Sequence, residues 1–158
     1  MTLEDLTKKE LGIVKSLNTT KKVQEFIVSD IKYAKQDDGH YTMRSFRGVV
    51  RDKEAHCFEG VVFAASVLSF HGYAPLILCM ESNEIDHNLF VYWKGGKVGS
   101  VAKSRRKELL GKPPIFDDYA HLVMSYYPDY YNDLRNDKND ITLRGFAIAD
   151  LRVFGNSW

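Results

Sequence analysis

Residues 51–72 of this 158-residue chain read RDKEAHCFEGVVFAASVLSFHG, and the composition of the segment changes abruptly from charged to apolar. The change falls on Cys57, and from Phe58 to Leu68 nearly every residue is apolar or small. A helix that is apolar on all sides is buried on all sides. The segment therefore predicts a central buried helix with Cys57 at or near its N-terminus.

The N-terminus of a helix favours the ionised form of a cysteine. Backbone N–H groups and the positive end of the helix dipole meet there, and both lower the pKa of a thiol. Cys57 is therefore the strongest candidate for a nucleophile in the sequence. The alternative is a structural thiol, because free cysteines are often buried as small apolar residues.

A single domain over residues 1–158 accounts for the length and composition. The apolar fraction of 44% and the charged fraction of 27% are typical of a soluble globular protein. The formal net charge of +1 gives no electrostatic basis for nucleic-acid binding. No segment approaches the roughly 18 apolar residues of a membrane span, and residues 1–10 contain no apolar signal-peptide core. We therefore expect a cytoplasmic protein whose two cysteines, Cys57 and Cys79, are reduced.

Two amphipathic helices are expected before the central helix, because apolar residues recur at helical spacing over residues 3–17 and 21–35. Residues 36–56 are polar and irregular, which predicts a long loop that leads to Cys57. Three arginines in this loop form either a solvated surface or a site for an anionic group: Arg44, Arg47 and Arg51. We expect Arg47 or Arg51 to form a buried ion pair with Glu59.

The remainder of the chain predicts a small sheet followed by one more helix. Short apolar runs and the Gly95-Gly96 turn indicate strands over residues 74–80, 87–93 and 98–104. A helix is expected from Phe116 until Pro128 ends it, residues 132–140 are expected to form an exposed loop, and residues 141–151 form a last strand or an extended tail. The fold class is therefore α+β, with N-terminal helices in residues 1–35, a Cys/His core in residues 55–104, and a C-terminal helix and tail in residues 115–158.

His87 is the best candidate for a base that activates Cys57. It opens a strand directly after a polar loop, where a side chain can face a cleft. The order of helix, strand and returning strand brings the N-terminus of the helix and the start of the second strand to one edge of the sheet. A thiolate–imidazolium pair also needs a group that orients the far nitrogen of the ring.

These segments resemble the transglutaminase-like superfamily. Its cysteine motif is similar to residues 55–60 (AHCFEG), followed by Ala64-Ala65, Leu68 and residues 71–75 (HGYAP), and its histidine strand and hairpin are similar to residues 86–91 (DHNLFV) and 95–99 (GGKVG). Arylamine acetyltransferases, peptide N-glycanases and bacterial transglutaminase-like cysteine peptidases share this core. The segment from Ala55 to about Asn132 most closely resembles a set of small, uncharacterised bacterial transglutaminase-like proteins. The resemblance implies a papain-like fold, in which one central helix packs on an antiparallel sheet.

The chain departs from the family at the third catalytic position. The family usually has an aspartate on the strand after the hairpin, and residues 98–104 (VGSVAKS) contain no carboxylate. Ser100 or Ser104 is the candidate that orients His87. A hydroxyl stabilises an imidazolium less than a carboxylate does.

Two functions remain open at this stage. In the first, Cys57 and His87 form the site of a hydrolase or acyltransferase that acts on an amide or thioester of a peptide or small molecule. In the second, the chain is an inactive transglutaminase-like scaffold that serves as a binding module, which the missing carboxylate favours. No cofactor is expected, and the spacing of His56, Cys57 and His87 matches no zinc pattern.

Overall fold

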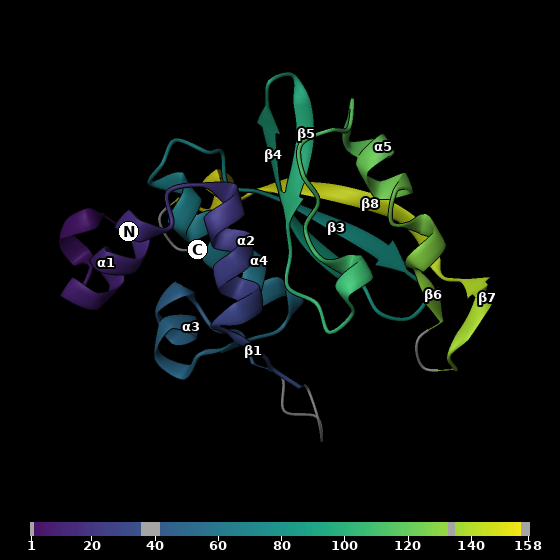
Figure 1. The fold of residues 1–158 in the computed structure, drawn as a ribbon, viewed down its shortest axis with the longest axis horizontal. Helices are drawn as coiled ribbons and strands as arrows, with labels where there is room; N and C mark the ends of the chain where they lie inside the picture. The colour runs from purple at the N-terminus through teal and green to yellow at the C-terminus, as the bar shows by residue number, and fades with distance from the viewer. Residues whose placement is uncertain (1, 36–41, 133–134, 156–158) are drawn as a thin grey trace.

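The computed structural model describes residues 2–35, 42–132 and 135–155, and it shows a mixed α/β domain built around a small antiparallel sheet (Figure 1). Four strands form this sheet in the order β5-β4-β3-β8. Helix α4 (Cys57–Ser69) packs against β4, the strand that begins at His87. The central buried helix and the antiparallel sheet are therefore as expected.

The helices and strands divide the chain as follows. The α-helices are α1 (Lys8–Ser16), α2 (Thr20–Ser29), α3 (Phe46–Asp52), α4 and α5 (Tyr119–Met124), and the 3-10 helices are η1 (Leu3–Asp5), η2 (Lys107–Leu109), η3 (Tyr127–Asp129) and η4 (Leu151–Phe154). The strands are β1 (Lys32–Tyr33), β2 (Glu54–Ala55), β3 (Leu76–Ser82), β4 (His87–Lys94), β5 (Lys97–Val101), β6 (Tyr131–Asn132), β7 (Asp137–Ile141) and β8 (Leu143–Asp150).

Apolar side chains cover both faces of the four-stranded sheet. On one face, Ile77 and Phe90 join the core that surrounds α4. On the other face, Leu78 and Leu89 pack with residues from and around α5, including the fully buried Tyr126. Successive residues of a strand point to opposite faces of the sheet, so β3 and β4 contribute side chains to both cores. This is why their sequences are continuous apolar runs.

The N-terminal region differs from the two long helices that the sequence predicts. Thr7 caps α1 through a capping box with Glu10, so the helix begins only at Lys8. Helix α2 ends at Ser29, and the chain then extends as β1, which pairs in parallel with β2. Ile31 is nevertheless buried, because its side chain enters the same core from the bend between α2 and β1.

The predicted loop over residues 36–56 contains a helix. Ser45 caps α3 by accepting from the N–H of Gly48, and Phe46, Val49 and Val50 are buried at helical spacing. Residues 36–41 of that prediction lie outside the described residues. The three arginines pair with carboxylates: Arg47 with Glu10, Arg51 with Asp52, and Arg44 with Asp52, Glu54 and Glu59. The partner of the buried Glu59 is therefore Arg44, and the prediction of Arg47 or Arg51 was wrong.

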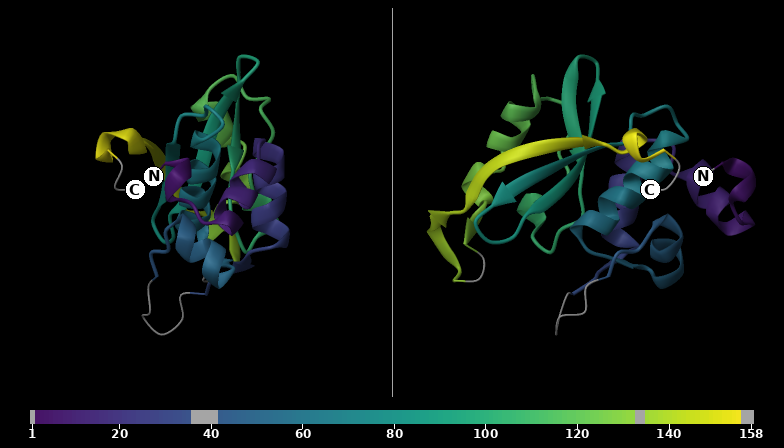
Figure 2. Two further views of the ribbon diagram at one scale, coloured as in Figure 1. Left: turned by 90° about the vertical axis from the view of Figure 1, so that its left-hand side faces the viewer. Right: turned by 180° about the vertical axis from the view of Figure 1, so that it is seen from behind.

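The C-terminal segment adds a strand to the sheet. Residues 143–150 form β8, which pairs antiparallel with β3 and runs across the back of the domain (Figure 2). Part of the predicted exposed loop at residues 132–140 is β7, which pairs with β6. No helix in the described part of the chain combines the length and apolar character needed to cross a bilayer.

Two glycines in helices predict opposite effects of substitution by alanine. A Cβ at Gly60 would lie 2.6 Å from the Cβ of Lys103, whose buried ammonium donates to the carbonyls of Ile27 and Ile31. A Cβ at Gly12 meets nothing within 4 Å. We expect Gly60→Ala to lower the free energy of unfolding by about 1–3 kcal/mol through overpacking, and Gly12→Ala to raise it by up to about 1 kcal/mol through helix propensity. Urea denaturation of both variants checks this, and equal effects would contradict the close packing of α4 against Lys103.

Candidate active site

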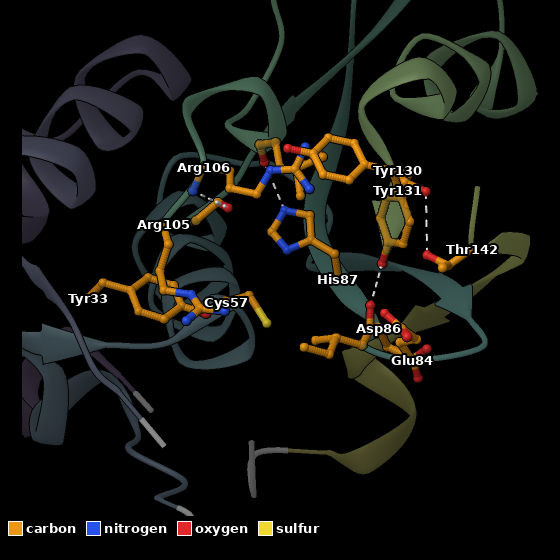
Figure 3. Close-up of a pocket in the computed structure, with 13 residues that line it drawn as sticks. Tyr33, Cys57, Glu84, Asp86, His87, Arg105, Arg106, Tyr130, Tyr131 and Thr142 are labelled. Atoms are coloured by element: carbon orange, nitrogen blue, oxygen red, sulfur yellow. Dashed lines mark hydrogen bonds between the residues drawn. The ribbon is translucent and has the colours of Figure 1, made fainter. Parts of the chain in front are cut away.

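Cys57 is the first residue of α4, and His56 is the N-cap. A pocket with about 550 Å³ of empty space, part of it open to solvent, lies at this end of the helix. Figure 3 shows Cys57 and Tyr33 on one side of the pocket, His87 in the middle, and Tyr130 and Tyr131 on the other side. The lining residues come from β1, α4, the β3–β4 loop, the start of β4, the segment between β5 and η2, η2, the end of η3 with β6, and the residue before β8. They are Tyr33, Cys57, Glu84, Ile85, Asp86, His87, Ser104, Arg105, Arg106, Leu109, Tyr130, Tyr131 and Thr142.

His87 is buried and is oriented by a backbone group. Its Nε2 lies 2.8 Å from the carbonyl oxygen of Leu109 in η2. A carbonyl only accepts hydrogen bonds, so Nε2 carries a proton. This leaves Nδ1 free to act on Cys57, and the imidazole lowers the pKa of the thiol. The structure therefore brings the two residues predicted from sequence into the same pocket.

The surroundings of Cys57 favour the thiolate. Burial raises the pKa of the thiol, but hydrogen bonds from His56, His87 and Asn88, together with the charge of His87, outweigh burial and lower the pKa to about 5. Asn88 donates from Nδ2 to Sγ at 3.8 Å. Cys79 provides a contrast within the same chain, because burial and nearby carboxylates raise the pKa of its thiol to about 11. Both cysteines are free, and only Cys57 has the environment of a nucleophile.

The serines proposed to orient His87 have other partners. The Oγ of Ser104 accepts from the backbone N–H of Arg106, and the buried Ser100 is linked to Tyr126. The structure therefore corrects the assignment of Ser100 and Ser104 as the third residue: the carbonyl of Leu109 occupies that position. Every residue has a backbone carbonyl, so residue types alone do not identify the one that accepts from His87.

Ser100 belongs instead to a hydrogen-bond chain that ends beside Leu109. The N–H of Lys112 donates to Ser100 Oγ at 2.9 Å, Ser100 Oγ lies 2.9 Å from the Tyr126 hydroxyl, and that hydroxyl donates to the Leu110 carbonyl at 2.9 Å. The Tyr126 hydroxyl has a single proton, and it donates that proton to the Leu110 carbonyl. The Ser100 hydroxyl is therefore the donor in its hydrogen bond with Tyr126. A Cβ at Gly111 would lie 2.5 Å from the Ser100 carbonyl oxygen. The loop that presents Leu109 is therefore closely packed on β5.

His56 is a second histidine at the thiol, and its role was missed from the sequence. The side chain is buried, and its Nε2 lies 2.9 Å from the carbonyl of Thr42. Burial lowers the pKa of His56, but hydrogen bonds to Cys57 and Thr42 and the charge of Glu59 outweigh burial and raise it. The capping-box spacing of His56 and Glu59 was the available signal, because an N3 glutamate turns back to the N-cap residue.

Glu59 organises this side of the site. Its carboxylate has no solvent exposure and accepts from the backbone N–H of Arg44 at 2.7 Å and of His56 at 3.0 Å, and Arg44 Nη1 lies 3.2 Å away. Burial raises the pKa of Glu59, but these hydrogen bonds and nearby positive charge outweigh burial and lower it. The carboxylate thus joins the chain before α3 to the first turn of α4.

Tyr33 closes the pocket beside the helix N-terminus. Its hydroxyl is within hydrogen-bond reach of the backbone N–H of Cys57, and burial raises its pKa. The guanidinium of Arg105 lies 5.8 Å from the centre of its ring. On the opposite wall, the guanidinium of Arg106 stacks 4.0 Å from the centre of the Tyr131 ring and donates to the Asp129 carbonyl.

No family model matches the sequence, and a search of curated proteins finds no match. The geometry of the site therefore carries the functional argument.

The Glu59 carboxylate makes a pH-dependent contribution to stability. A carboxyl group whose pKa is lowered in the folded state stabilises the fold above its unfolded pKa of about 4.3, and this contribution is lost as the pH falls through the folded pKa. Glu59→Gln should lower the free energy of unfolding at pH 7, by about 3 kcal/mol or more for a broken buried ion pair. The deficit should shrink as the pH falls below about 4.3 and through the folded pKa, where wild type also loses the charge. Urea denaturation at pH 7 and over a series of lower pH values measures it.

Glu25→Gln is the matched control, because Glu25 pairs with Lys21 on the exposed face of α2. An exposed pair contributes at most about 1 kcal/mol. A Glu59 variant no less stable than the Glu25 variant at pH 7 would contradict the organising role of the buried carboxylate.

Proposed function

We propose that the protein is a thiol-dependent hydrolase or acyltransferase that acts on an amide or thioester, with Cys57 as nucleophile and His87 as base. The observation that carries the proposal is the placement of Cys57 at the N-terminus of α4, in a pocket that it shares with an imidazole whose far nitrogen is held by Leu109. A transglutaminase-like, papain-like core is part of the proposal. The buried helix on an antiparallel sheet supports it, as does the order of cysteine and histidine along the chain.

The reaction has two half-reactions. The Cys57 thiolate attacks the carbonyl carbon and forms a carbon–sulfur bond, while the carbonyl electrons move onto oxygen. When the tetrahedral intermediate collapses, the bond to the leaving amine or thiolate breaks, and protonated His87 gives its Nδ1 proton to that group. The first half-reaction leaves the acyl group on Cys57 as a thioester. In the second, neutral His87 takes a proton from water or from an acceptor nucleophile. The deprotonated oxygen or nitrogen then attacks the thioester carbonyl, and the carbon–sulfur bond breaks to release the Cys57 thiolate.

Two N–H donors near the sulfur suit the negative oxygen of the intermediate. The backbone N–H of Cys57 lies at the positive end of α4, and the amide of Asn88 already donates toward Sγ. Donors fixed before the reaction stabilise the developing charge without reorganisation. The Tyr33 hydroxyl is also within reach of the Cys57 N–H, so a bound substrate must share or replace that hydrogen bond.

A neutral carbonyl in place of a carboxylate favours a second candidate function. Leu109 orients the imidazole but adds no full negative charge, so it stabilises the imidazolium less than an aspartate would. The alternative is therefore a binding module that keeps the scaffold without turnover. The His56–Glu59 pair weighs against it, since it places a second stabilising group at the thiolate.

The pH dependence of alkylation tests the activation of Cys57. Iodoacetamide reacts with the thiolate, so the rate should rise with pH around a midpoint near 5. His87→Ala should move that midpoint upward, because the variant loses a hydrogen bond and a positive charge at sulfur. His56→Ala should also raise it. Peptide mapping by mass spectrometry separates Cys57 from Cys79, which should stay unlabelled at pH 6.

A midpoint near 8.5, the value of an ordinary thiol, in both wild type and His87→Ala would contradict the nucleophile assignment. Circular dichroism of each variant separates a lost interaction from lost folding.

Acyl transfer itself is tested with an activated thioester. Wild-type protein should release the thiol product and carry a transient acyl group on Cys57, detectable by intact-protein mass spectrometry after acid quench. Cys57→Ala should abolish both signals, whereas Cys79→Ser should retain them. A low-pKa Cys57 that forms no acyl group with thioester or amide probes would favour the binding module. The proposed substrate is a peptide, amide or small molecule in the cytoplasm, without a nucleic-acid or membrane partner.

A further inference from the structure

Strand β8 forms one edge of the four-stranded sheet, next to β3 (Figure 2, right). Within residues 2–35, 42–132 and 135–155, no strand pairs with its outer side. Residues 145–149 of this edge read GFAIA and contain neither a charge nor a proline. Monomeric proteins usually protect an edge strand of this length with charges, prolines or a covering segment.

The hydrogen-bond pattern shows which backbone groups face outward. The N–H of Leu151 donates to the carbonyl of Pro75, just beyond β3. Backbone groups of alternate residues point to the same side of an antiparallel strand, so Gly145, Ala147 and Ala149 also point toward β3. The outward groups are those of the residues between them, Phe146 and Ile148, and of Asp150. The ladder with β3 shifts register between Gly145 and Leu143, so Arg144 lies at a β-bulge beside this regular stretch.

We propose that β8 pairs with β8 of a second copy of this chain, antiparallel, about a twofold axis at Ala147. Phe146 then lies opposite Ile148 of the second copy, and Arg144 lies opposite Asp150 of the second copy. The N–H and C=O groups of Phe146 and Ile148 face outward, so both residues gain backbone partners in this register. The pairing also brings the side chain of Arg144, at the β-bulge, to Asp150 of the second copy. The two sheets join into one of eight strands, with the order β5-β4-β3-β8-β8-β3-β4-β5.

Charge complementarity selects the second copy and this register. Arg144 and Asp150 lie three residues on either side of Ala147, so a twofold axis at Ala147 places opposite charges together twice. A shift of the axis by one residue, to Phe146 or to Ile148, places Arg144 opposite Ile148 or opposite Arg152 instead, and neither residue offers an opposite charge. Asp150 already accepts from Arg152, and its carboxylate has acceptor capacity for a further donor.

Side-chain burial favours the same arrangement. Phe146 and Ile148 are 38% and 40% exposed. They share the sheet face of their cross-strand neighbours Met80 and Leu78. An aromatic residue opposite a β-branched residue is a stabilising cross-strand pair, and the proposed register creates two of them.

Sedimentation velocity across a concentration series measures the association. Wild type should shift from monomer to dimer as concentration rises. Arg144→Asp should raise the dissociation constant roughly tenfold or more, because it places like charges together twice. The double variant Arg144→Asp, Asp150→Arg should recover most of the loss. A monomer at all concentrations overturns the proposal and leaves the edge to strand addition by another peptide. A dimer insensitive to Arg144→Asp overturns the register.

Disulfide trapping tests the position of the axis independently of affinity. In a Cys57→Ser, Cys79→Ser background, Ala147→Cys provides one cysteine per chain. Across the axis the two Cα atoms at position 147 form a non-hydrogen-bonded pair about 4.5 Å apart, within disulfide range. Ala149→Cys is the matched control on the same sheet face, with its two copies roughly 13 Å apart. Selective dimer formation by Ala147→Cys on non-reducing gels supports the proposal, and equal or reversed cross-linking overturns it.

Circular dichroism of all variants confirms that the fold is retained. Ile148→Lys gives a second route should the charge variants unfold. It introduces a charge at an already exposed side chain and should also weaken the dimer. The Cys57→Ala variant should dimerise as wild type does. The test of dimerisation is therefore independent of the test of Cys57 as a nucleophile.

Discussion

The candidate site depends on one buried carboxylate. Glu59 has no contact with solvent, and it receives two backbone N–H groups from segments that the sequence separates by twelve residues, at Arg44 and His56. A buried charge without these partners would be costly, so the two segments are held at a fixed distance from α4. His56 therefore keeps its position against the sulfur, and Thr42 is placed to receive the His56 ring. The geometry at Cys57 follows from this arrangement.

The second half of the site is held differently. His87 and Asn88 are consecutive residues at the start of β4, where they pair with Met80 and Cys79 of β3. From Phe90 onward β4 is also paired with β5, so both side chains extend from the end of a strand that the sheet holds on both sides. The group that orients the imidazole comes from a loop, and the chain from Lys112 through Ser100 and Tyr126 fixes that loop to the sheet. A strand of the sheet thus supplies the imidazole, and a closely packed segment supplies the carbonyl that accepts its hydrogen bond.

The parts of the fold with strong periodicity were predictable from sequence. The all-apolar run after Cys57, the two glycines at the hairpin and the apolar segments of β3 and β4 gave the central helix and most of the sheet. Tertiary context overrode weaker signals: Ile31 keeps helical spacing but is buried from a bend after α2, and α3 is a short helix within a polar region. The proximity of Cys57 and His87 was predictable because both residues are recognised by their side chains in the sequence. The Leu109 acceptor was not, because every residue has a carbonyl.

Because a backbone carbonyl orients His87, the positions most sensitive to mutation are not the ones that contact the imidazole. An aspartate or asparagine that orients a catalytic histidine is lost by one codon change, whereas a main-chain acceptor survives any change of side chain at position 109. The vulnerable positions move to the loop that holds it, above all to Gly111, where a Cβ would meet the Gln24 side chain and the Ser100 carbonyl. Substitutions should therefore be tolerated at Leu109, whose carbonyl accepts from His87. They should be rejected by selection at Gly111, which makes no contact with the imidazole.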